Sequence, residues 1–127
     1  MRNFLTNIFF TCFFFAVNAQ SFTGEQLKQG YALFSDRLTF LYDENIYDTA
    51  PERIYVTGSF RGWDAAFDEK WQLKKSGTIW SLTMDNENDR EIPAKSEFKF
   101  LMDNANWQEV AHSPKNEKGG NLVYKYN

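Results

Sequence analysis

Cysteine and histidine are nearly absent from this 127-residue chain, which contains one residue of each type. The cysteine, Cys12, lies in an N-terminal apolar run, so the rest of the chain has no disulfide and no thiol nucleophile. The histidine, His112, has no second histidine at metal-ligand spacing, and no Gly-x-Ser-x-Gly motif offers a serine nucleophile. We therefore expect no enzyme activity, no cofactor and no bound metal.

Long apolar runs are confined to the N-terminus, where a positively charged start precedes Phe4–Val17. Residues 17–19 have the small or modest side chains that a signal peptidase reads. The pattern predicts a signal peptide over residues 1–19, cleaved between Ala19 and Gln20, and a secreted or periplasmic protein. The run is shorter than the roughly 20 residues of a membrane span, so we expect no membrane insertion after cleavage. An uncleaved anchor is the alternative.

Basic clusters are also missing: without residues 1–19 the net charge is −4, from 13 basic and 17 acidic residues. This acidity argues against nucleic acid as a partner. Several carboxylates fall in polar segments, and we interpret them as solvated loop charges: Asp43, Glu44, Asp48, Glu52, Asp85, Glu87 and Asp89. The alternatives are an acid–base pair for glycoside cleavage and a calcium site at Asp85, Asn86 and Asp89.

Short β-rich runs separated by turn residues dominate the remaining sequence. Residues 20–36 read as a lead-in, in which Thr23 and Gln26 have capping-box spacing and Gly30 is a helix stop. From Arg37 onward the hydrophobic period is two. Seven strands are predicted, over residues 37–42, 53–59, 71–74, 78–84, 97–102, 107–110 and 121–126. This pattern predicts one all-β domain over residues 37–127, an antiparallel β-sandwich of about seven short strands.

Alternation assigns side chains to the two faces of these strands. In the strand beginning at Thr78, Trp80 shares a face with Leu82 and Met84 and is predicted to lie in the core. In "EFKFLM", Lys99 points away from the face of Phe98 and Phe100.

The other three tryptophans, Trp63, Trp71 and Trp107, fall at loop or turn edges. Exposed aromatic rings suit sugars, because stacking covers the apolar face of the sugar while polar side chains bind its hydroxyls. Packing at the edge of a sandwich is the equally weighted alternative for each tryptophan.

Several short motifs then occur in a fixed order: "RIYVTGSFRGWD", Trp71, Trp80, "EFKFLMD", Asn106-Trp107 and "GGNLV". Together they resemble the glycogen- and starch-recognising early-set domains, family 48 of the carbohydrate-binding modules, over roughly residues 37–126. The resemblance implies an immunoglobulin-like β-sandwich that binds carbohydrate without catalysis, most favourably an α-1,4-glucan. It implies that Trp63 and Trp107 stack on glucose rings and that Lys99 and Asn121 bind hydroxyls.

The chain's ending, with "WQE" and "GGNL", resembles early-set domains attached to secreted bacterial glycan-degrading enzymes. A plant cell-wall polysaccharide is therefore the second choice of glycan. The alternative function is an accessory or interaction domain that packs on a catalytic domain or partner protein without binding sugar.

Overall fold

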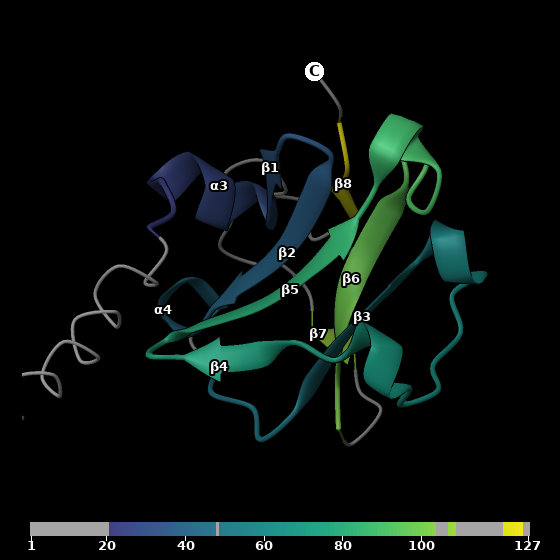
Figure 1. Ribbon diagram of the computed structural model, residues 1–127. Coiled ribbons are helices and arrows are strands. Elements are labelled where there is room, and N and C mark those ends of the chain that lie inside the picture. Colours follow the sequence, from purple (N-terminus) through teal and green to yellow (C-terminus); the bar gives the residue numbers. More distant parts are fainter. Residues whose placement is uncertain (1–20, 48, 104–106, 109–120, 126–127) are drawn as a thin grey trace, which may run out of the picture.

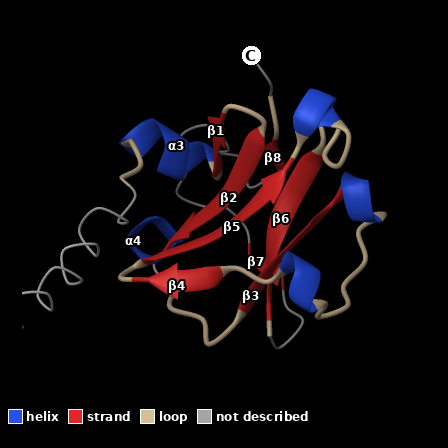
Figure 2. Ribbon diagram, in the orientation of Figure 1, coloured by secondary structure: helices blue, strands red, loops and turns tan. Residues whose placement is uncertain are grey.

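Two antiparallel sheets form the framework of the computed structural model, which describes residues 21–47, 49–103, 107–108 and 121–125 (Figures 1 and 2). The predicted signal peptide, His112 and the turn at residues 104–106 lie outside these residues. The prediction of an all-β fold is confirmed: the helices are short and the strands form both layers.

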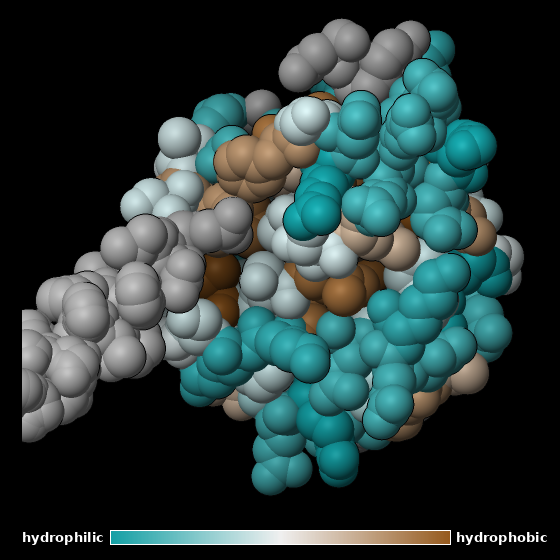
Figure 3. Space-filling model, in the orientation of Figure 1, coloured by the Kyte–Doolittle hydropathy of each residue, from teal (hydrophilic) through white to brown (hydrophobic). Residues whose placement is uncertain are grey.

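The first sheet has the order β1-β2-β5-β4, formed by β1 (Tyr31–Phe34), β2 (Arg37–Asp43), β5 (Ile79–Asp85) and β4 (Lys74–Ser76). Its register places Tyr42 opposite Trp80 and Phe40 opposite Leu82. These side chains face the core, as the alternation predicts for Trp80. Figure 3 shows that the face of the molecule carrying β2, β5 and β4 is mainly hydrophilic, with hydrophobic residues visible near its centre.

The second sheet is built around β6 (Glu97–Met102). On one side β6 pairs with β3 (Ile54–Gly58), and it also pairs with β7 (Trp107–Gln108) and β8 (Leu122–Val123) at different points along its length. Phe98 and Phe100 point into the core, where they contact rings from the first sheet: Phe98 lies 5.1 Å from Phe40 and Phe100 lies 5.5 Å from Tyr42, centroid to centroid. Burial of these aromatic rings holds the two sheets together.

The lead-in segment, residues 20–36, contains a short helix followed by a strand. Helix α3 (Gly24–Gln29) has the predicted capping box between Thr23 and Gln26, and Gly30 ends it in the left-handed conformation. Directly after the helix, β1 pairs with β2 along the edge of the first sheet. Strand β1 is absent from the seven strands that the sequence predicts, because a four-residue run directly after a helix shows no clear hydrophobic period.

The strand predicted over residues 71–74 is wrong in its bounds. Trp71 ends a 3-10 helix, η2 (Glu69–Trp71), which Asp68 caps by accepting a hydrogen bond from the Lys70 N–H. Gln72 forms only an isolated bridge with Tyr55, and β4 begins at Lys74. Trp71 itself is buried in the core rather than displayed at a loop edge.

The loop that follows β2 also differs from its interpretation as solvated. Helix α4 (Glu44–Tyr47) occupies it, Asp43 is buried at the end of β2, and Tyr47 packs on Tyr42. Glu44 accepts a hydrogen bond of 2.8 Å from the Trp80 indole and lies 3.3 Å from the Lys75 ammonium. The indole hydrogen bond, followed by the lysine, lowers the pKa of Glu44.

Candidate functional site

The candidate site is built where β3 ends and the chain turns over the second sheet. Gly58 closes β3 in an extended conformation, and a Cβ there would collide with the Glu97 carbonyl oxygen and with the Phe60 ring. A glycine is therefore required by the close approach of two backbones. The 3-10 helix η1 (Ser59–Arg61) follows, and Gly62 ends it with a φ of 62°.

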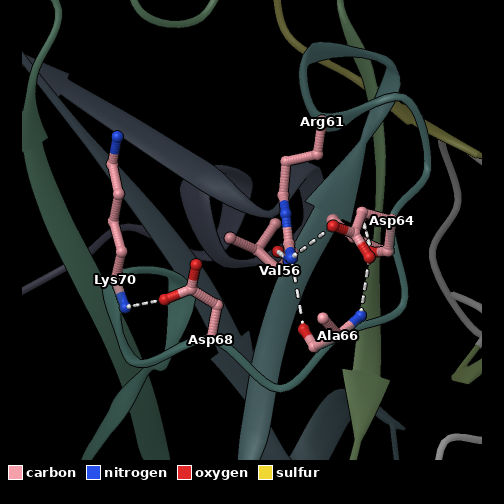
Figure 4. Close-up of polar contacts among 7 residues, drawn as sticks. Val56, Arg61, Asp64, Ala66, Asp68 and Lys70 are labelled. Atoms are coloured by element: carbon pink, nitrogen blue, oxygen red, sulfur yellow. Dashed lines mark hydrogen bonds and ion pairs between the residues drawn. The ribbon is translucent and has the colours of Figure 1, made fainter.

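Arg61 fixes the loop that leads from this helix to η2. Its side chain is only 5% exposed. The guanidinium donates hydrogen bonds to the carbonyls of Val56, at 2.9 Å, and Ala66, at 3.2 Å (Figure 4). It also lies 5.3 Å from the centre of the Trp71 ring and 4.0 Å from the Asp64 carboxylate. One cation thus joins the edge of β3, the loop and the core.

Trp63 is half-buried in this loop and has a φ of 60°. Its backbone N–H donates to the Gly58 carbonyl at 2.9 Å. The next residue, Asp64, accepts a hydrogen bond of 2.7 Å at its backbone carbonyl from the Thr57 hydroxyl. Since Val56 faces the core, Thr57 faces outward, and this bond draws the loop over the outer face of the second sheet.

The outer face of the second sheet brings most of the predicted residues into one neighbourhood. Lys99 is half-buried and lies directly opposite Thr57 in the register of β3 and β6. Two residues further along β6, Leu101 is flanked by Tyr55 on β3 and by the backbone of Trp107 on β7. The side chain of Trp107 lies outside the described part of the structure.

Asn121 lies beside the same strand, near the start of β6. It is half-buried, and its side-chain amide donates a hydrogen bond of 2.7 Å to the Glu97 carboxylate. Glu97 and Lys99 are two residues apart on β6 and therefore share a face. Asn121 thus borders the face that carries Lys99, with its amide donor directed at Glu97.

Two aromatic residues near this face, Phe67 and Tyr55, were not among the predicted site residues. Phe67 is 42% exposed, and its ring stacks on that of Tyr55 with centroids 4.9 Å apart and an interplanar angle of 16°. A phenylalanine four positions after Trp63, among polar and small residues, is the feature of the sequence that marks it.

A second surface feature lies elsewhere, between the β1–β2 turn and the loop after β5. It is an open pocket of about 300 Å³ lined mainly by polar residues. Its Tyr124 hydroxyl donates to Asp89 at 2.6 Å, and Asn86 bonds to the backbone of Glu91 and Ile92. These side chains are used to hold the loop together.

Within the described ranges, no three His, Cys, Asp or Glu side chains group in a way that would hold a metal ion. The helices of the described chain are all too short or too polar to cross a membrane. A scan against protein-family models finds no match for this chain, and a search of curated proteins finds no similar sequence.

Proposed function

We propose that this protein is a secreted, non-catalytic carbohydrate-binding domain with an immunoglobulin-like, early-set β-sandwich. The favoured ligand is an α-1,4-glucan, bound by Trp63, Trp107, Lys99 and Asn121. The observation that carries the proposal is the backbone conformation of Trp63, which has a φ of 60°.

A bulky residue in the left-handed region costs about 1–2 kcal/mol relative to the ordinary conformations. Such strain persists only where surrounding contacts hold it, and it is concentrated at functional sites. Here the Arg61 and Thr57 hydrogen bonds hold the loop. Their effect is to hold Trp63 in this conformation within a loop that lies over the outer face of the second sheet, where a glycine or asparagine would satisfy the turn at lower cost.

The neighbouring groups match the chemistry of a sugar. An indole stacks on the apolar face of a pyranose ring, with a gain of about 1 kcal/mol beyond area burial. The Lys99 ammonium is a hydrogen-bond donor of the kind that hydroxyl oxygens accept from. Affinity is expected to be modest, because an open sheet face leaves many hydroxyls in water.

The test is retention in affinity gels that contain glycogen, starch or plant cell-wall polysaccharides. We expect the wild type to be retarded by α-glucans and Trp63→Ala to migrate as in a gel without polysaccharide. The thermal midpoint of this variant should stay within a few degrees of the wild type, because the indole is half-buried. Trp63→Phe keeps a stacking ring and should retain part of the retardation.

A wild type that no α-glucan retards would refute the α-glucan assignment. Retardation by cell-wall polysaccharides alone would move the proposal to that class of glycan. No retardation by any polysaccharide, together with a concentration-dependent dimer, would instead support the interaction-domain alternative.

A further inference from the structure

Phe67 is an exposed aromatic ring that is supported on one face by a buried tyrosine, Tyr55. One face of the ring lies parallel to Tyr55, which is itself 6% exposed. Because that face is covered, most of the 42% that remains exposed belongs to the other face and the rim of the ring. The result is a flat apolar surface on a rigid base, which is the geometry that stacking on a ligand requires.

The backbone around Phe67 is fixed by hydrogen bonds within the loop that also contains Trp63, and Arg61 is common to both parts of the loop. Arg61 donates to the Ala66 carbonyl, and the Ala66 N–H donates to the Asp64 carboxylate at 2.9 Å (Figure 4). The Asp68 N–H also donates to the Ala66 carbonyl, at 3.0 Å. Asp68 then caps η2. Little ordering entropy remains to be lost at this position when a ligand binds.

The carboxylate of Asp64 lies between Trp63 and Phe67 in the sequence. The Asp64 side chain is 60% exposed, and Ala66 and Arg61 engage only part of the roughly four lone-pair positions of its carboxylate. The remaining positions can accept hydrogen bonds from hydroxyls. Trp63 and Phe67 are four residues apart, at most about 14 Å along an extended chain, a span that several linked sugar rings can bridge.

We propose that Phe67 is a further stacking platform, and that the site takes an oligosaccharide of several rings with Asp64 as a hydroxyl acceptor between the platforms. This inference rests on the proposed function. It adds a ring and an acceptor beyond Trp63, Lys99, Trp107 and Asn121, and it makes affinity depend on ligand length.

The experiment compares binding of maltotriose and maltoheptaose by titration calorimetry. In the wild type, maltoheptaose should bind more tightly than maltotriose. Phe67→Ala should weaken maltoheptaose binding about two- to tenfold, the effect of one aromatic stack, with little change for maltotriose. Phe67→Tyr keeps the ring and should bind like the wild type. Phe67→Leu, which still covers Tyr55, should behave like the alanine variant and serves if the latter fails to fold.

Phe34 provides the matched control, because it is 40% exposed but lies on β1 of the other sheet. Phe34→Ala should leave both affinities unchanged. If Phe67→Leu and Phe67→Ala bind both sugars as the wild type does, the inference about Phe67 is overturned while the proposed function stands. If the wild type binds neither sugar and no α-glucan retards it, the α-glucan proposal fails first and this inference fails with it.

Discussion

Two loops of this molecule are each held by a buried polar side chain that bonds to the loop backbone, and they differ in which of their residues have positive φ. The first, the aromatic loop, covers residues 59–68 after β3. The second, the Asn86 loop, covers residues 86–96 after β5. In each, one buried polar side chain bonds to backbone groups of its own loop: Arg61 to the Ala66 carbonyl, and Asn86 to the N–H groups of Glu91 and Ile92.

Both loops also contain non-glycine residues with positive φ, and here they diverge. The Asn86 loop uses Asn88 and Asp89, at 56° and 54°, which are among the residue types that tolerate this region best, and also Lys95, at 70°. The aromatic loop uses Trp63, which tolerates it poorly. An ordered loop is therefore no indication of function in itself. What sets the aromatic loop apart is that its left-handed residue is a tryptophan, a side chain suited to stacking on a ligand.

The largest effect is expected from Asn86→Ala, which should destabilise the fold and spare binding. Asn86 is 6% exposed, and its loss leaves the Ile92 carbonyl and the Glu91 and Ile92 N–H groups without this partner. We expect the free energy of unfolding in urea to fall by about 2–4 kcal/mol. Asn88→Gly is the matched control and should change it by no more than about 0.5 kcal/mol. Weakened glucan retention in folded Asn86→Ala would contradict the division of roles between the loops.

Arg61→Ala should have a smaller effect on stability and a clear effect on binding. It removes the hydrogen bonds to the Val56 and Ala66 carbonyls, for an expected loss of about 1–3 kcal/mol. Since those bonds position both Trp63 and Phe67, glucan retention in affinity gels should fall with it. Arg61→Lys cannot form the two-pronged contact and should give an intermediate result. Full retention in a destabilised Arg61→Ala would show that the loop is displayed without this anchor.

The smallest effect is a pH dependence that Tyr124 contributes through its hydrogen bond to Asp89 in the Asn86 loop. Burial, with the Asp89 hydrogen bond, raises the pKa of Tyr124 to about 12, against about 10 in an unfolded chain. The raised pKa means that the neutral hydroxyl contributes full stability below about pH 10 and loses it as the pH rises towards 12. Between about pH 9 and about pH 11.5, urea unfolding of the wild type should therefore weaken more than that of Tyr124→Phe.

Tyr42, whose pKa burial also raises to about 12, is common to both proteins, so the difference between them isolates Tyr124. Equal loss of stability in the two proteins would show that Tyr124 does not hold the Asn86 loop.

Prediction from sequence succeeded where a local pattern decides the structure. The capping box of α3, the span of β6 and the inward face of Trp80 all follow from spacing within one short segment. It failed at Trp71, where the same few residues suit a short strand or a 3-10 turn. There the burial of the ring against Phe60 and the Asp68 cap decided the outcome.

The candidate site divides in the same way. Alternation along β6 suffices to turn Lys99 away from Phe98 and Phe100, and the motif "GSFRGW" marks Trp63 as unusual. The role of Arg61 and the support of Phe67 by Tyr55 depend on contacts between the loop and β3, which no local period encodes.

The sequence by itself thus determined the helix cap and the inward and outward faces of β5 and β6, because these depend on residues two to four positions apart. Only the tertiary structure decided that Gly58 must lack a side chain, that Trp71 is buried and that one arginine joins β3 to the loop that contains Trp63 and Phe67. Those outcomes depend on which backbones approach each other, and that is settled when the two sheets pack.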